Sequence, residues 1–360
     1  MDEFECKVKI VSGPGAAQRL ENFDARRLFL VTDPFFHKNG TAQRIAKGSK
    51  AEVVEIFSDV RPDPTVELAA EGTAKLKTFD PDLIVALGGG SAMDCAKAMT
   101  FFAQTDAKLV AIPTTSGSGS EVTDFAILTH NKVKHPLVDK RLRPCMAILD
   151  SDLLQEMPAS LIADTGFDLL THAVEAYVAT DAGAFSDMLA QEAFRSGYGA
   201  LPASFAGRKD LRLKVHLAAT MAGMAFTHAG LGLCHAMAHA LGGMFHVPHG
   251  QLNAVLLPSI VSTNAHVAGE KYAQLARFCG MGGTADAVAV RNLRNNLVRL
   301  RRELRLPETL AQAGIAPAAL RGAMNEIVNA TLADPCCRTN PMKPEAFLVR
   351  RILEEVTGRV

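Results

Sequence analysis

The 360-residue chain carries 38 basic and 38 acidic side chains, so its formal net charge is zero. A neutral chain lacks the long-range field that gathers nucleic acid or anionic lipid, which excludes both as expected partners. The hydrophobic fraction of 48% excludes extensive disorder. The length is too great for one ordinary core and favours two domains.

The sequence predicts no targeting segment and no disulfide framework. Seven scattered cysteines form neither a CxxC pair nor an even disulfide framework, which favours a reducing cytosol. The N-terminal MDEFECKVKI lacks a basic stretch followed by an apolar core, so no signal peptide is expected. No uncharged run approaches the ~18 residues needed to span a membrane. We therefore expect a cytoplasmic protein without a membrane partner.

The first 150 residues alternate short β-branched runs with helical patterns. The runs are apolar on both faces, which is typical of parallel strands covered by helices on each side. Helices are predicted over 63–79 and 91–102, and 125–138 is predicted to be a hairpin. This alternation indicates a doubly wound α/β domain. The predicted strands are 28–33, 53–57, 83–90, 108–115 and 146–150.

Strand-like runs disappear after about residue 158, and alanine, leucine, methionine and arginine dominate. Proline or glycine marks many of the joins, as at Pro202 and Pro248. The composition predicts an α/β domain over 1–155 and an all-helical domain over 156–360. Its helices are predicted over 161–180, 184–200, 210–228, 235–245, 250–264, 268–279, 284–304, 317–331 and 343–356.

Two glycine-rich loops follow predicted strands of the α/β half. In LIVALGGGSAMD a buried strand leads into three glycines and a serine, which lets backbone amides approach a phosphate. That loop alone is also compatible with a tight structural turn, and it is not the GxGxxG fingerprint. The loop PTTSGSGSE follows the next strand, and loops after neighbouring parallel strands meet at one sheet edge. Together they predict a dinucleotide site, with Thr114, Thr115 and Ser118 lining it and Lys134 reaching it from the hairpin.

Asp33 ends the first predicted strand, in LFLVTD. A carboxylate in this position accepts hydrogen bonds from an adenosine ribose and repels a 2′-phosphate, which predicts NAD(H) over NADP(H). The alternative is a strand-terminating turn formed by Asp33 and Pro34.

The stretch CHAMAHALGGMFHVPHG places four histidines within fifteen residues. His235 and His239 are four apart and share one helix face, and Pro248 breaks the helix before His249. Asp168 and His172 have the same spacing in GFDLLTHAVEAY. Three imidazoles and a carboxylate suit Fe(II), Zn(II) or Mn(II) rather than a thiolate site. Spacing alone does not decide which histidines bind, because His228 and His246 are also candidates.

The motifs GGGSAMDCAKA, PTTSGSGSEVT, GFDLLTHAVEAY and HAMAHALGGMFHVPHG, in this order, resemble those of the iron-containing (group III) alcohol dehydrogenases. The similarity extends over essentially the whole chain, including LADPCCRTNP. PDPT, GGGSAMD and RTNP are most similar to the 1-propanol dehydrogenases of propanediol-type bacterial microcompartments.

The resemblance implies an N-terminal NAD-binding domain, a helical metal-binding domain and an active site in the cleft between them. The metal, Fe(II) with Zn(II) as the alternative, would be held by Asp168, His172, His235 and His249. His239 matches a histidine implicated in catalysis rather than in metal binding. The implied cofactor-binding positions are Asp33, Gly89, Gly90, Ser91, Asp94, Thr114, Thr115, Ser118 and Lys134.

These motifs together predict an NAD-dependent alcohol dehydrogenase that acts on short aldehydes and primary alcohols. A metal of this kind polarises the substrate oxygen, and His239 would relay the proton. We expect a homodimer or higher homo-oligomer, and microcompartment proteins are candidate partners. The alternatives are glycerol dehydrogenase, maleylacetate reductase or dehydroquinate synthase chemistry, or a silent scaffolding subunit. The lack of Lys and Arg between Ala218 and His249 disfavours the synthase.

Overall fold

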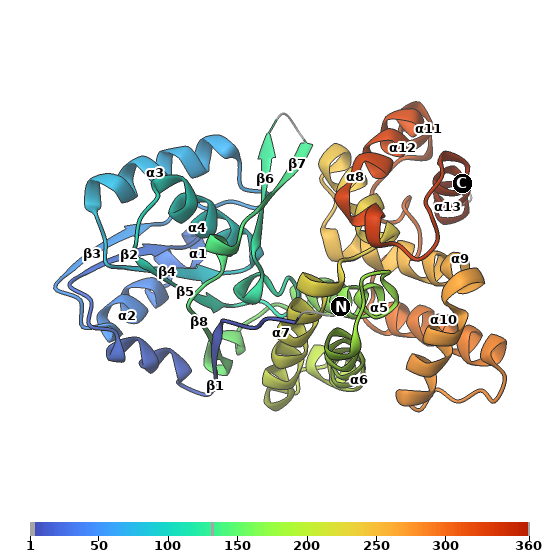
Figure 1. Ribbon diagram of the computed structural model, residues 1–360, viewed down its shortest axis with the longest axis horizontal. Coiled ribbons are helices and arrows are strands. Elements are labelled where there is room, and N and C mark those ends of the chain that lie inside the picture. Colours follow the sequence, from blue (N-terminus) through green and yellow to red (C-terminus); the bar gives the residue numbers. More distant parts are fainter. Residues whose placement is uncertain (1–3, 131–132, 359–360) are drawn as a thin grey trace. The chain divides into compact units, whose positions relative to one another are not determined.

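The computed structural model describes residues 4–130 and 133–358. They form two compact units, of which one is Glu5–Met157 and the other contains Phe4 and the residues from Pro158 onward. The first unit is α/β and the second is helical (Figure 1). The predicted fold class, a parallel α/β part followed by a helical part, is confirmed.

The α/β unit is built on one six-stranded sheet in which every neighbouring pair of strands is parallel. Alternate strand residues face opposite sides, so that Leu28 and Phe29 belong to different core clusters. The sheet is therefore covered on both faces, as the doubly wound pattern predicts (Figure 1). The strand order is β1 (Lys9–Gly13), β8 (Met146–Asp150), β5 (Lys108–Pro113), β4 (Leu83–Gly88), β2 (Arg27–Val31) and β3 (Val53–Phe57).

Helices of the α/β unit lie on the two sides of this sheet. The side of Phe29 is covered by α3 (Val66–Phe79) and α4 (Gly90–Ala103). The opposite side is covered by the 3-10 helix η1 (Ala16–Asn22) and by α2 (Thr41–Gly48). The short helix α1 (Pro34–Lys38) precedes α2, and short 3-10 helices η2 (Ser120–Val122), η3 (Lys140–Leu142) and η4 (Ser151–Leu154) lie in the loops.

The two edge strands differ from the predictions. β1 was not predicted, because its residues are mostly exposed and it has no continuous apolar run. β3 was predicted to be covered on both faces, but Val53 and Val54 are 44% and 39% exposed. An edge strand has only one neighbour, so its outer positions are not enclosed as those of central strands are.

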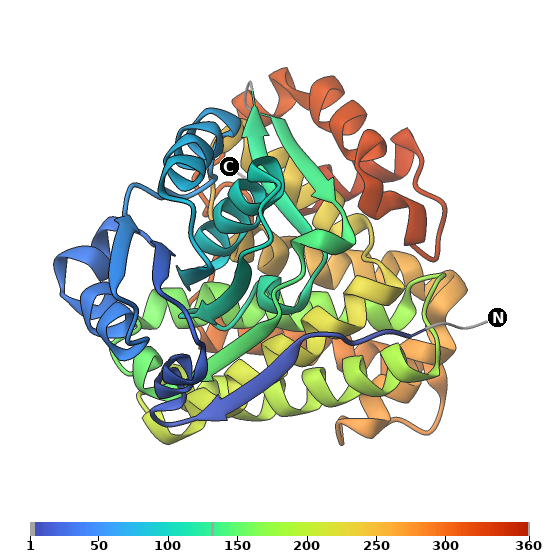
Figure 2. The same cartoon turned by 60° about the vertical axis from the view of Figure 1, so that its left-hand side comes forward.

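The predicted hairpin over 125–138 is present as β6 (Phe125–His130) and β7 (Val133–Val138), paired antiparallel in a separate two-stranded sheet. The Thr129 amide donates to the Pro64 carbonyl at 2.8 Å, which attaches the hairpin to the chain before α3. In Figure 2 the hairpin lies beside α4, and the two elements are in contact.

The helical unit is organised around α5, whose residues from Gly166 to Val178 are all buried. α5 packs against α6, α7 and α9, which lie side by side with it in Figure 2. The helices are α5 (Ala159–Val178), α6 (Ala184–Phe205), α7 (Arg212–Ala229), α8 (Leu233–Phe245), α9 (His249–Phe278), α10 (Asp286–Glu303), α11 (Pro317–Gly322), α12 (Met324–Ala333) and α13 (Ala346–Val356), with 3-10 helices η5 (Lys209–Leu211) and η6 (Pro335–Thr339).

The helix end predicted at Pro202 is wrong. α6 continues through Pro202 to Phe205, because Leu201 and Ser204 are buried in helix contacts that hold the last turn. Packing there outweighs the local helix-breaking signal. The join predicted between the helices 250–264 and 268–279 is present as a non-helical kink at Ala268, which divides α9 into two helical segments.

Among the helices that the structure describes, no single one is long and apolar enough to cross a membrane. The pair Lys209–Ala229 and Leu233–Phe245, bent by 104°, meets the length and composition test only when the two helices are taken together.

Candidate active site

Helix α5 brings Asp168 and His172 onto one face. The two residues are four apart, so one lies a helical turn above the other. Both side chains are buried, at 8% and 5% exposure. The His172 ring is stacked on Phe226 of α7, with ring centroids 4.5 Å apart, which holds the imidazole in one orientation.

The α8–α9 junction supplies the other histidines. His235 and His239 are one turn apart in α8, which ends at Phe245. His246 then adopts a left-handed conformation (φ 55°), and Pro248 directly precedes the first residue of α9, His249. The break predicted at Pro248 is therefore present. It reverses the chain and turns His249 toward His235, with ring centroids 5.3 Å apart.

One carboxylate oxygen lies at the centre of this group. Asp168 Oδ1 is 3.5 Å from Nε2 of both His235 and His249, and 3.9 Å from Nδ1 of His172. These separations exceed the 2.7–3.2 Å of ordinary N–H···O bonds. They resemble the spacing between atoms that bind one shared cation about 2.1 Å from each.

The electrostatics of the group favour a cation. Burial alone would raise the pKa of Asp168, but the imidazoles of His172, His249 and His235 bring it far below its usual value. Burial would lower the pKa of His235, but the carboxylates of Asp168 and Glu175 raise it to about 9. In the described part of the chain, His235 Nε2 is buried without a hydrogen-bond partner. A buried imidazole nitrogen aimed at a carboxylate in this way fits a metal ligand.

Glu175, which was not among the predicted site residues, holds His235 in place. The buried carboxylate lies 2.6 Å from His235 Nδ1 and accepts the backbone amides of Cys234 and His235 at 2.7 and 3.3 Å. It thus caps the start of α8 and directs Nε2 toward Asp168. Glu175 lies seven residues after Asp168 on the same helix face, a spacing that would have identified it.

Asn253 orients the Asp168 carboxylate in a similar way. Its amide Nδ2 donates to Asp168 Oδ1 at 2.7 Å, and its side chain is fully buried. Asn253 is four residues after His249 in α9, so both side chains lie on one helix face. This amide hydrogen bond stabilises the charged form of the Asp168 carboxylate.

His239 is set apart from this group by its partner. Its Nδ1 lies 2.9 Å from Asp334 Oδ2, and both side chains remain partly exposed. Its ring is stacked on His249, with centroids 5.2 Å apart, so it lies beside the group. Asp334 is 95 residues away in sequence and carries no local signal that would have identified it.

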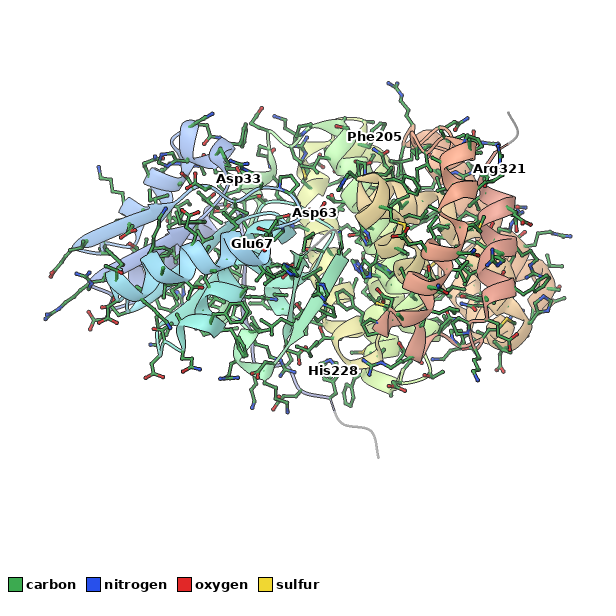
Figure 3. The ribbon with its side chains drawn as sticks, turned by 90° about the horizontal axis from the view of Figure 1, so that it is seen from above. Asp33, Asp63, Glu67, Phe205, His228 and Arg321 are labelled. Carbon is green, nitrogen blue, oxygen red and sulfur yellow. The ribbon has the colours of Figure 1, made fainter. Side chains whose placement is uncertain are left out.

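The two remaining histidine candidates lie elsewhere. His246 is the left-handed C-cap of α8, a structural position. His228 lies near the end of α7 and is labelled in Figure 3. Its ring is stacked on Phe4 at 4.1 Å and its Nδ1 is 2.9 Å from the Met224 carbonyl.

In the α/β unit, the structure brings the two glycine-rich loops together. β4 and β5 are neighbours, and the Thr114 amide donates to the Gly88 carbonyl at 2.9 Å. A Cβ on Gly89 would lie 3.2 Å from Thr115 Oγ1, and one on Gly90 would lie 3.1 Å from Ser118 Oγ. The loops are in contact only because both glycines lack side chains. No side chain caps the start of α4, and backbone amides at a helix start of this kind favour a phosphate.

Asp33 lies at the end of β2, the strand on the other side of β4. Its Oδ1 accepts the amides of Phe35 and Phe36 at 2.8 and 3.1 Å, so it caps α1. The turn role that the sequence left open is therefore present. Oδ2 lies toward the loop, 3.4 Å from the position that a Cβ on Gly88 would occupy. Asp33 is labelled in Figure 3.

Asp94 and Lys134 are engaged with protein partners. Asp94 accepts the Ser120 hydroxyl at 2.7 Å and the Ile127 amide at 3.2 Å, which links α4 to the second loop and the hairpin. Lys134 forms an ion pair with Asp63 at 2.9 Å, a residue labelled in Figure 3. The buried Lys97, which the sequence analysis missed, adds hydrogen bonds to Ser120, Thr123 and Phe125.

Comparison with known proteins gives consistent matches. The family model described as iron-containing alcohol dehydrogenase matches residues 7–151, and that of the C-terminal region of the same family matches residues 162–357. The chain is 37% identical to 1-propanol dehydrogenase PduQ of Salmonella typhimurium, over 99% of this chain and 100% of that protein.

Two further relatives differ in the cofactor that their names state. The NADPH-dependent butanol dehydrogenase of Clostridium saccharobutylicum is 35% identical over 98% of this chain and 97% of its own length. The crystal structure of sulfoacetaldehyde reductase from Bifidobacterium kashiwanohense, in complex with NAD+, superposes with a TM-score of 0.89 at 25% identity. That match covers 99% of this chain and 98% of the other.

Proposed function

The chain belongs to the iron-containing alcohol dehydrogenase family, and we propose that it interconverts short-chain aldehydes and primary alcohols, such as propanal and 1-propanol, with NAD(H) as the hydride carrier. The observation that carries the proposal is the approach of three imidazoles, from α5, α8 and α9, to within 3.5–3.9 Å of the single oxygen Asp168 Oδ1. A propanol and a butanol dehydrogenase among the relatives support the substrate class.

The proposed metal ligands are Asp168, His172, His235 and His249. Bound Fe(II), or Zn(II) in its place, would supply Lewis acidity toward the substrate oxygen. Nitrogen and oxygen donors accept either ion, and the family's description favours iron. Glu175 and Asn253 would keep His235 and Asp168 oriented whether or not the ion is present.

The proposed proton carrier is His239. Asp334 accepts from Nδ1, which leaves Nε2 as the nitrogen that exchanges a proton with the substrate. Burial would raise the pKa of Asp334, but the hydrogen bonds from His239 and Cys336 lower it below its usual value. Asp334 is therefore a carboxylate at neutral pH and stabilises the protonated imidazole.

The proposed cofactor site uses the loops of the α/β unit. The start of α4, with Gly89, Gly90 and Ser91, would hold the diphosphate, and Thr114, Thr115 and Ser118 would line the second side. The contacts between these loops support that role. We assign Asp94 and Lys134 to the same site, Asp94 through the loop that it holds. The free Oδ2 of Asp33 would bind the ribose and repel a 2′-phosphate, which favours NAD(H).

Location and assembly are also part of the proposal. The identity to a 1-propanol dehydrogenase, together with the motifs PDPT and RTNP, supports a cytoplasmic enzyme that associates with a bacterial microcompartment. We further propose a homodimer or higher homo-oligomer. Size-exclusion chromatography with light scattering of the purified protein measures its mass directly, and a monomeric mass would refute this part.

The decisive experiment is anaerobic purification with metal analysis, followed by NADH oxidation against a series of short aldehydes. We expect about one iron per chain and aldehyde-dependent NADH oxidation that is strongest with C2–C4 substrates. Incubation with a chelator should remove the metal and the activity together. Metal-replete protein that oxidises no NADH with any of these aldehydes would refute the proposed function.

A further inference from the structure

A second group of metal-capable side chains lies beside the proposed active site. It consists of His239 of α8, Asp334 before η6 and Cys336 within η6. One nitrogen, one carboxylate oxygen and the Cys336 sulfur all lie within 4.8 Å of one another. We propose that these three residues form a regulatory metal site that takes Zn(II) or a similar borderline divalent cation, and that its occupation stops turnover.

The geometry of the three donors is close to that of a tetrahedral site. With zinc about 2.0–2.3 Å from N, O and S donors, neighbouring ligand atoms lie about 3.3–3.7 Å apart. His239 Nδ1 and Asp334 Oδ2 are 2.9 Å apart, so they need to separate by only a few tenths of an ångström. The Cys336 sulfur lies within 4.8 Å of a donor atom on each of the other two residues, and rotation of its side chain would close the remaining gap. Water would occupy the fourth position.

The backbone already positions two of the donors. Asp334 Oδ1 accepts the Cys336 amide at 2.8 Å, which fixes the carboxylate and leaves Oδ2 toward His239. The two residues are only two apart, so the turn that places one also places the other. The three residues are partly exposed, so a cation from solution can reach them without unfolding of the site.

The donor chemistry separates this site from the first one. The proposed iron ligands are oxygen and nitrogen only, whereas the second group includes a thiol. A thiolate favours zinc and cobalt over a hard cation such as magnesium. Binding would release the Cys336 thiol proton to solvent, and no oxidation or reduction takes place.

Occupation of this site would remove the proton acceptor of the proposed reaction. In the neutral imidazole of His239, Nδ1 donates to Asp334 and Nε2 is free to accept a proton. A metal on Nδ1 moves the ring proton to Nε2, which then has no lone pair to accept another and cannot release the proton that it holds without forming an imidazolate. Proton exchange at His239 therefore stops in both directions of the reaction. This consequence rests on the proposed role of His239, whereas metal binding itself does not.

Cobalt(II) provides a direct test of binding. We expect Co(II), added anaerobically to the iron-loaded enzyme, to produce a thiolate-to-cobalt charge-transfer absorption that saturates at one equivalent. Cys336→Ser should abolish this band. The control is Cys337→Ser, because Cys337 is adjacent and its sulfur instead lies 3.0 Å from the Thr331 carbonyl; it should keep the band. A wild-type enzyme without the band, or a Cys336→Ser variant that retains it, would overturn the proposal.

Inhibition is tested separately, by NADH oxidation at increasing Zn(II) with the first metal in place. Removing a ligand should weaken binding at least as much as removing an outer partner of a metal site, about 10-fold or more. The inhibitory Zn(II) concentration should therefore rise by that factor in Cys336→Ser and stay unchanged in Cys337→Ser. Equal inhibition of both variants would refute the regulatory role. The optical titration requires no turnover, so it remains decisive even if the proposed function fails.

Discussion

The two units of this chain build their candidate sites in opposite ways. In the α/β unit the site consists of backbone loops that follow three neighbouring strands, β2, β4 and β5. In the helical unit it consists of a carboxylate and imidazoles brought together from α5, α8 and α9. The site in the α/β unit depends on glycines such as Gly89 and Gly90, which have no side chain to fill the space between the loops. The site in the helical unit depends on side chains that are buried.

This difference determines how each site tolerates change. A glycine loop is lost when a Cβ fills the space that it leaves open. A buried group of a carboxylate and imidazoles loses its geometry when one of its residues is substituted. The remaining side chains then have an unbalanced charge, or an imidazole nitrogen that no longer points at the site. Substitutions in the two units should therefore affect different measured quantities, cofactor binding in one and metal content in the other.

The largest effect on activity is expected for two histidines of α8 and α9. It distinguishes the proposed metal ligand His249 from the proposed proton carrier His239. His249→Ala should lose the metal and all activity together. His239→Ala should keep the metal and lose about 10²- to 10⁴-fold in kcat, the range for general acid–base catalysis. Metal analysis and single-turnover kinetics distinguish the two variants. Full metal and full activity in both would show that the histidines are wrongly assigned.

The second prediction concerns Glu175, which lies 2.6 Å from Nδ1 of His235 and accepts two backbone amides of α8. In Glu175→Gln the neutral side chain can still accept from the amides of α8, but it holds the imidazole less strongly. Metal affinity should fall about 10- to 100-fold while the helical content is unchanged. Equilibrium metal titration with a competing chelator measures this loss. Glu270→Gln, an exposed position in α9, is the matched control, and an equal loss in both would contradict the role.

The third prediction concerns Gly90 in the α/β unit. Gly90→Ala places a Cβ 3.1 Å from the Ser118 side chain and should force the two loops apart. Overpacking of this kind costs about 1–3 kcal/mol, which predicts NADH binding about tenfold weaker or more with unchanged metal content. Gly48→Ala is the control, since a Cβ there meets no atom within 4 Å. NADH fluorescence titration measures the difference, and loss of metal in Gly90→Ala would contradict the expectation that the two sites respond separately to substitution.

The smallest effect is expected at Asp33, which has two roles. Asp33→Ser keeps an oxygen that can cap α1 but removes the charge that would face a 2′-phosphate. The ratio of kcat/KM for NADPH to that for NADH should rise about tenfold, equivalent to about 1.4 kcal/mol. Steady-state kinetics with both cofactors measures the ratio, and thermal unfolding checks that the cap survives. An unchanged ratio would leave Asp33 with only its capping role.

Much of the fold and part of the site could be predicted from short stretches of sequence. Five of the six strands of the large sheet, the hairpin and the helical second half follow from hydrophobic periodicity and from proline and glycine positions. The pairs Asp168–His172 and His235–His239 follow from the same period, because a four-residue spacing defines one helix face. Each of these features is determined by residues within one or two helical turns or within one strand.

The remaining features depend on residues distant in sequence, so only the tertiary structure decided them. Local periodicity does not determine the strand order or the continuation of α6 through Pro202, because packing in the whole unit sets them. The partners of His239 and His235, Asp334 and Glu175, are 95 and 60 residues away. Each carboxylate becomes a partner only because folding brings an imidazole nitrogen within 3 Å of it. Sequence alone therefore indicated which side chains could bind a metal, and the fold showed which groups contact those side chains.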